Sequence, residues 1–218
     1  KISDAINAVL GSPVSASATA TEATAVCKWA GLTSNDLDIE VDLNDTDIGI
    51  TYVVSSSVSG AGTPSVQGGL DQFGSTWNTI VINGYGTESG TMDLLEQFNG
   101  IPDPVLPTGR YDPIVWKPFI ALTGSVSDNP SNITDVRKDD VTIAICPAPL
   151  SKGWQFEAAA NAAVLHARIA QDNPNIGIGG KSYSDMPAPD VIGSMGDFVN
   201  RQSFVTKGCS TVDLVNGV

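Results

Sequence analysis

Three compact apolar runs, separated by helical patterns, constrain the fold of this 218-residue chain more than any other feature. The runs are W-N-T-I-V-I-N (77–83), W-K-P-F-I-A-L-T-G (116–124) and V-T-I-A-I-C-P (141–147), and helical patterns occupy 64–73, 88–98, 129–137 and 154–171. Strands that are apolar almost throughout and alternate with helices are typical of a parallel sheet covered on both faces. The sequence therefore predicts an α/β fold with an open, mostly parallel sheet and helices on both faces.

The first part of the chain has a different pattern. Residues 1–10 predict an amphipathic helix with Ser3 as its cap. Residues 37–44 alternate apolar and acidic side chains, and 50–58 read as another strand. The G-A-G-T-P segment (60–64) marks a break. We therefore expect a small β-rich unit with an N-terminal helix at 1–62 and an α/β domain at 63–218.

The C-terminal residues predict a helix followed by an incomplete hairpin. Apolar or long side chains recur at helical spacing at Phe198, Val199, Gln202 and Val205, and Lys207-Gly208 is a helix stop. Residues 210–214 then alternate like a strand, and Asn216-Gly217 favours a two-residue hairpin turn. Since the sequence stops at Val218, we expect a fragment of a longer polypeptide whose returning strand is missing.

Composition excludes several classes of function. The net charge of -13, with 11 basic residues and no basic run, argues against a nucleic-acid partner. No apolar run approaches the roughly 20 residues needed to cross a membrane. The three cysteines lie far apart and His166 is the single histidine, so neither a zinc site nor a disulfide framework is expected and a reduced cytosolic origin is favoured.

Several segments resemble catalytic or binding motifs, and each is incomplete. I-G-I-G-G-K-S-Y (176–183) has Asn175 where a phosphate loop has glycine, and it follows a helix. His166 lacks a nucleophile elbow, and the acidic segment 42–49 lacks the terminal glutamate of a calcium loop. The turn N-G-Y-G-T (83–87) follows a core strand at a carboxyl end of the sheet, where α/β enzymes bind ligands, but its G-x-G lacks the third glycine and the following acidic residue of a dinucleotide site. No catalytic residue, cofactor or metal ion is predicted, and the alternative is a small α/β hydrolase or nucleotide-binding domain that uses this turn.

The helix expected at 154–171 is rich in alanine on almost every face. Small side chains let backbones approach closely. We expect this helix to pack tightly, either on the sheet or against another subunit.

In order and spacing, most of the chain resembles the tail sheath proteins of contractile phages, in particular the Mu-like branch. The quoted segments are A-G-L-T-S-N-D-L-D-I-E-V (30–41), W-N-T-I-V-I-N-G-Y-G-T with T-M-D-L-L-E-Q-F (91–98), F-I-A-L-T-G-S (119–125), I-A-I-C-P-A-P (143–149) and the alanine-rich helix running into D-N-P (172–174). The last is the family's N-x-x-R…G-x-S-T-V…N-G-V pattern, which is represented here by Asn200, Arg201, Gly208, Ser210, Thr211, Val212, Asn216, Gly217 and Val218. The family usually has D-P-A-R-P after that helix, and this chain has Asn175 in place of the arginine.

The resemblance implies a structural subunit without enzyme activity. Its partners would be neighbouring copies of the sheath subunit, the tail tube protein, and the baseplate and tail terminator proteins, in a virion tail assembled in the host cytoplasm. Sheaths of bacteriocins or secretion machines are equally compatible. Terminal arms of the family add strands to neighbouring sheets, and this chain is expected to lack them. We expect Arg201, Lys207, Val212 and Asn216 at the subunit interface, with the two cations exposed and forming ion pairs across it.

Overall fold

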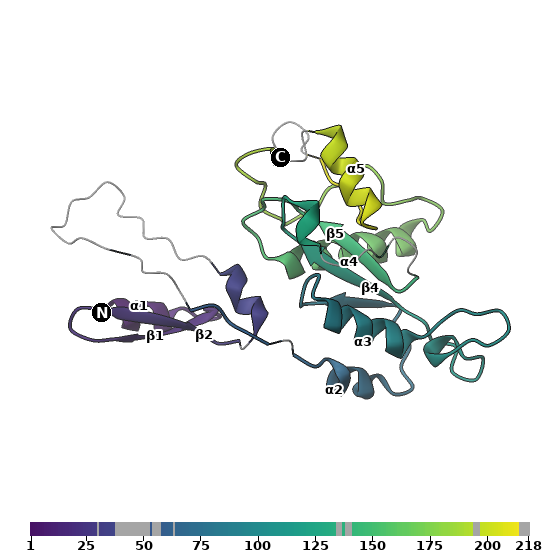
Figure 1. Cartoon of the computed structure of the whole chain (residues 1–218), viewed down its shortest axis with the longest axis horizontal. Helices are drawn as coiled ribbons and strands as arrows, with labels where there is room; N and C mark the ends of the chain where they lie inside the picture. The colour runs from purple at the N-terminus through teal and green to yellow at the C-terminus, as the bar shows by residue number, and fades with distance from the viewer. Residues whose placement is uncertain are drawn as a thin grey trace. The chain divides into compact units, whose positions relative to one another are not determined.

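The computed structural model divides the chain into two compact units, Lys1–Pro64 and Ser65–Val218. It describes residues 1–29, 31–37, 53, 58–62, 64–133, 137, 141–193 and 197–213. Figure 1 shows the elements of both units along the chain. The strands expected at 37–44 and 50–58, the acidic segment 42–49 and the turn at Asn216 lie outside the described residues, apart from single positions.

The first unit contains a helix and a hairpin. Helix α1 (Ile2–Ala8) packs against strand β1 (Val14–Ala18), which pairs antiparallel with β2 (Ala23–Cys27). The Asn7 side chain fastens the helix to the strand, because it donates to Ala16 O and accepts from Ala16 N, each at 2.8 Å. A 3-10 helix, η1 (Leu32–Asp36), follows.

The predicted cap of α1 is wrong. Lys1 occupies the cap position, while Ser3 lies inside the helix and is buried. The hairpin at 14–27 was not predicted either, because its alanine, serine and threonine residues carry little hydrophobic pattern.

The second unit is built on a three-stranded parallel sheet in the order β3-β4-β5. The strands are β3 (Ile80–Asn83), β4 (Ile120–Ser125) and β5 (Ile143–Pro147), so each lies within or beside one of the three apolar runs. Cys209 forms an isolated parallel bridge with Ile145 and thus continues the sheet beyond β5.

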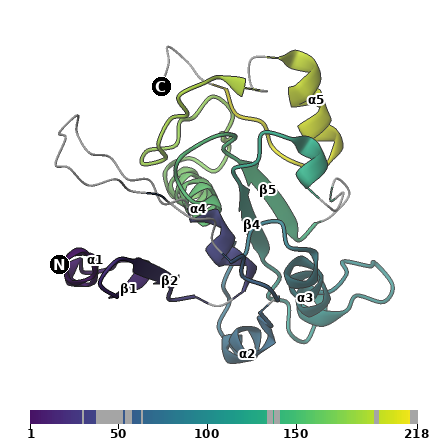
Figure 2. The same ribbon diagram turned by 60° about the vertical axis from the view of Figure 1, so that its left-hand side comes forward.

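Helices cover both faces of this sheet, which confirms the predicted α/β class. Figures 1 and 2 show α3 (Ser89–Asn99) and α4 (Gln155–Asp172) on opposite sides of the strands. Alternate strand residues face the two layers: Ala121 and Ile145 join the cluster under α3, whereas Leu122 and Cys146 join the cluster under α4. This alternation follows from the twofold repeat of a strand.

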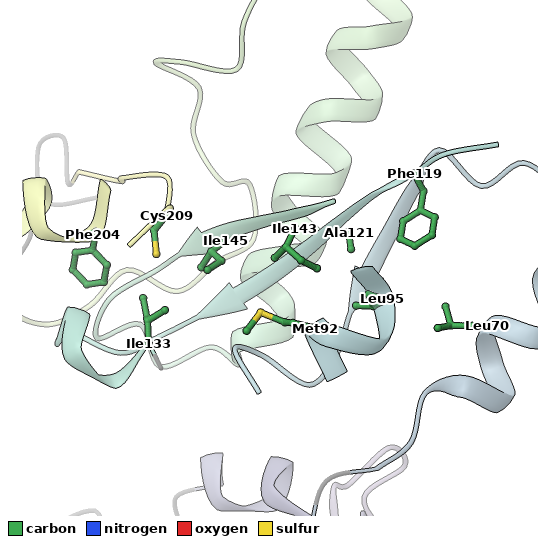
Figure 3. Close-up of a cluster of buried hydrophobic side chains, with 10 residues drawn as sticks. All are labelled: Leu70, Met92, Leu95, Phe119, Ala121, Ile133, Ile143, Ile145, Phe204 and Cys209. Carbon is green, nitrogen blue, oxygen red and sulfur yellow. The ribbon is translucent and has the colours of Figure 1, made fainter. Parts of the chain in front are cut away.

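The larger cluster lies on the α3 face. Figure 3 shows it running along the strands from Leu70 and Phe119 at one end to Phe204 and Cys209 at the other. Leu70 comes from α2 (Gln67–Leu70), which is followed by η2 (Asp71–Phe73), and Phe204 comes from α5 (Phe198–Thr206). The smaller cluster seats Ala159, Ala162 and Ala163 of α4 on the opposite face. The alanine-rich helix is therefore packed on the sheet.

One predicted helix is much shorter than expected. The segment 129–137 contains only the 3-10 turn η4 (Pro130–Asn132) among its described residues. Ile133 leaves this turn with an extended backbone, ψ 101, and its side chain is fully buried in the larger cluster. The chain thus leaves the helical conformation at Ile133, and this places the Ile133 side chain in the core.

Arg137 ties α3 to the C-terminal part of the unit. Its guanidinium forms ion pairs with Asp93 at 3.0 Å and Glu96 at 2.8 Å, and its backbone N donates to Lys207 O at 3.2 Å. The side chains of Arg137 and Glu96 are 11% and 25% exposed, so solvent screens this pair less than the pair with Asp93, which is 64% exposed. The 3-10 helix η3 (Gly109–Tyr111) lies in the segment between α3 and β4.

Candidate functional site

The turn after β3 is held together by a buried asparagine. Asn83 Nδ2 donates to Gly86 O at 3.0 Å and to Thr123 Oγ1 at 2.7 Å, and Asn83 Oδ1 accepts from Tyr85 N at 3.0 Å. Both donor positions of the amide are therefore occupied within the chain.

The first turn of α4 fills the space beside this asparagine-bound turn. A Cβ atom added to Gly86 would lie 2.2 Å from Gln155 Oε1, and one added to Gly124 would lie 1.5 Å from Gln155 O. Ligands of open α/β sheets bind in a crevice at the carboxyl ends of the strands. Here Gln155 stands in that place between β3 and β4, so the geometry gives no support to a ligand site at 83–87.

The remaining catalytic candidates lie apart from one another. His166 is half-buried in α4, and the segment 176–183 forms mostly exposed turns after that helix. Burial raises the pKa of the Cys146 thiol to about 12, with a further contribution from the neighbouring Cys209. The thiolate that nucleophilic chemistry needs is therefore absent at neutral pH. Among the described residues, no three His, Cys, Asp or Glu side chains gather to hold a metal ion.

Helix α5 presents an apolar face to solvent. Asp197 caps it by accepting from Val199 N at 2.9 Å, and Gly208, with φ +84, follows its end as predicted. Phe198 is 70% exposed and Val199 is 67% exposed, whereas Phe204 is buried. The apolar residues that recur at helical spacing thus form an exposed face, and the helix is anchored through Phe204 instead.

The two predicted interface cations are half-buried, which corrects the expectation that they are exposed. Arg201 Nη1 lies 2.6 Å from Asp213 Oδ2, and Lys207 Nζ donates to Ile133 O at 3.5 Å. Both therefore have acceptors inside the chain. An ion pair of either residue across a subunit interface stays a prediction.

The segment after α5 lies beside β5. Ser210 N donates to Ile145 O at 2.9 Å, next to the bridge of Cys209. Val212 follows and is half-buried, and Asn216 lies outside the described residues. The structure thus brings Arg201, Lys207 and Val212 to the same edge of the sheet, around α5.

Sequence reasoning missed two residues that complete these places. Asp213, which binds Arg201, and Gln155, which lies beside the turn after β3, carry no motif. Their roles follow from contacts between elements distant in sequence. The one local signal was that Asp213 is an acidic residue within the predicted strand 210–214.

No protein-family model, curated protein or solved structure matches this chain. No helix in the described part of the chain is long and apolar enough to cross a membrane.

Proposed function

We propose that this chain is a structural subunit of a contractile tail sheath, which polymerises in rings around a tail tube and contracts to drive the tube through the host envelope. Its partners are neighbouring copies, the tube protein, and the baseplate and terminator proteins, and its place is the virion tail after assembly in the host cytoplasm. The order and spacing of the segments that resemble tail sheath proteins support this class of assembly. Phage, bacteriocin and secretion-machine sheaths share it.

The observation that carries the proposal is the exposed apolar face of α5. Phe198, Val199 and Val205 are each about half exposed or more, and they lie on a helix whose other side is fixed in the core. Contiguous exposed apolar residues mark sites of protein association. A rigid sheet covered on both faces suits a subunit that moves as one body while its contacts repack.

Electron microscopy of the protein tests the proposal. We expect sheath-like tubes from the wild-type protein and few or none from Phe198→Asp, because the charge would be buried in the contact between copies. Phe198 is the first residue of α5, where an aspartate is compatible with the helix dipole. The thermal midpoint should therefore stay close to that of the wild type.

Val164→Asp is the matched control, because Val164 is also an exposed apolar residue on a helix, in α4. Tubes should persist in this variant. A monodisperse wild-type monomer with hydrolytic turnover would overturn the proposal. Equal loss of tubes in both variants would remove the special role of the α5 face.

A further inference from the structure

A second surface of the α/β unit contains a cavity of about 600 Å³ between α2, η2, the end of α3 and η3. Its lining includes Gln67, Asp71, Gln97, Arg110 and Val115. All of these residues belong to the second unit, and Figure 1 shows α2 at the opposite end of this unit from α5.

Arg110 is an unusual residue for a cavity wall, because only 5% of its surface is exposed. Nε donates to Lys117 O at 2.7 Å and Nη2 donates to Thr76 O at 2.9 Å. The guanidinium carbon lies 5.4 Å from the ring centre of Phe98 and 5.8 Å from that of Phe73. Carbonyl oxygens and aromatic faces therefore hold the cation in a fixed orientation.

The third nitrogen of this guanidinium, Nη1, reaches solvent, because it is not among the fully buried unpaired polar atoms of the described residues. Nη1 forms no hydrogen bond with any described residue, and no described carboxylate lies within ion-pair distance of Arg110. Burial lowers the pKa of Arg110, yet a guanidinium stays charged at neutral pH. Nη1 is thus the donor of this cation that a ligand can reach, and a carboxylate supplies both a counter-charge and an acceptor.

Val115, which lines the cavity, belongs to a segment with exposed apolar residues. This segment, between α3 and β4, also exposes Leu106 at 76% and Ile114 at 94%. Trp116 is 58% exposed and has φ +42, a conformation that non-glycine residues rarely adopt. Its backbone N donates to Asp112 O at 2.7 Å, which holds the turn.

We infer that the Arg110 cavity binds a carboxylate side chain of a second copy of this chain, while Val115 and the exposed apolar residues of its segment contact the residues that flank this carboxylate. The chain has 24 acidic and 11 basic residues, so a copy presents many carboxylates. Copies with a net charge of -13 repel each other, and a stable contact needs local cations that face acidic groups. This inference rests on the proposed function, since it assigns a neighbouring subunit to the cavity.

The cavity and the α5 face are two different surfaces of one subunit, as the geometry of a polymer requires. Rings and helical arrays form when two different surfaces of one subunit bind each other in a head-to-tail manner. The α5 face and the Arg110 cavity are two such surfaces. One negative group opposes the site: Asp71 lines the cavity and accepts from Gln67 Nε2 at 2.7 Å.

Sedimentation velocity of the 218-residue chain over a range of concentrations tests the inference. Gln97 is exposed and lines the cavity, so substitutions there need not disturb the core. Gln97→Glu places a competing carboxylate in the cavity and should weaken self-association about tenfold or more. Gln97→Lys, the matched variant, should not weaken it, and Asp71→Asn should strengthen it.

Arg110→Gln should abolish association, and circular dichroism shows whether this buried substitution leaves the fold intact. If Arg110→Gln disrupts the fold, the Gln97 variants still test the inference. A monomeric wild-type chain at every concentration, or equal association of wild type and Gln97→Glu, would overturn the inference. Wild-type and Gln97→Glu tubes that look identical would leave the sheath function standing and remove the cavity's role. Association that depends on Arg110 but never produces tubes would support the cavity's role and contradict the sheath function.

Discussion

Two buried asparagines complete the hydrogen bonding at opposite ends of the sheet. Asn83 does so after β3, as described above. At the amino ends of the strands, Asn99 Nδ2 donates to Phe119 O at 2.9 Å and to Thr142 Oγ1 at 2.8 Å, and Asn99 Oδ1 accepts from Phe119 N at 3.0 Å. Buried polar groups are costly unless paired, and both asparagines satisfy backbone groups where strand pairing ends.

Buried thiols make the free energy of unfolding depend on pH in the alkaline range. Burial raises the pKa of Cys146 to about 12 and that of Cys209 to about 11, the latter against a lowering effect of Lys207. Between pH 9 and 11 the unfolded chain loses these protons while the folded chain keeps them. The free energy of unfolding should therefore fall as pH rises, by up to about 1.4 kcal/mol per pH unit for each thiol.

Urea denaturation at a series of pH values measures this slope. Cys146→Ala should lower the stability at every pH, because it removes buried atoms, and should make the slope between pH 9 and 11 shallower. A Cys146→Ala, Cys209→Ala double variant with the wild-type slope would contradict the assignment to the thiols.

At the scale of elements, the close approach of α4 to β4 decides how the sheet is covered. The alanines of α4 let its backbone reach the strands, and Gly124 provides the matching gap on β4. The sequence pattern of small residues predicted a tight contact and left two candidate partners, the sheet and another subunit. The glycine at the end of the apolar run 116–124 was the local signal for the sheet.

Gly124→Ala should displace α4. The added methyl would lie 1.5 Å from Gln155 O and 3.2 Å from Ala159 N, and backbone atoms cannot move aside as a flexible side chain does. We expect a loss of about 3 kcal/mol, at the upper end of overpacking costs. Chemical denaturation measures it.

The control for this substitution is Gly177→Ala. No atom lies within 4 Å of a Cβ added at Gly177, and its φ is not in the left-handed region. The free energy of unfolding of Gly177→Ala should stay within about 0.5 kcal/mol of the wild-type value. Similar losses in both variants would point to a general effect of glycine replacement.

At the scale of the whole molecule, the chain consists of two units with separate interiors. All members of both buried clusters lie between residues 70 and 209, in the second unit. The elements of the first unit contact one another through α1, β1 and β2. The α/β unit therefore has the hydrophobic core that a domain needs to fold alone.

We accordingly expect residues 65–218, expressed alone, to keep their fold. Thermal unfolding followed by circular dichroism should give a cooperative transition with a midpoint within a few degrees of the corresponding transition in the whole chain. A non-cooperative or absent transition would show that the first unit is required for the core to form.

The sequence by itself determined the α/β class, the three parallel strands, the alanine-rich helix and the end of α5 at Gly208. These features depend on periodicity and on the conformational freedom of single residues, which are local properties. The helix predicted at 129–137 failed because burial of Ile133, a tertiary contact, outweighed helical propensity. Local pattern also suggested that Arg201 and Lys207 are exposed, whereas their acceptors come from other segments.

Only the tertiary structure decided which surfaces are filled and which are open. It seated Gln155 beside the turn after β3 and turned Phe198 and Val199 of α5 toward solvent. It also buried most of Arg110 while leaving Nη1 without a hydrogen bond to any described residue. Each outcome depends on which elements meet, because a side chain's burial and partners are set by residues far away in the sequence.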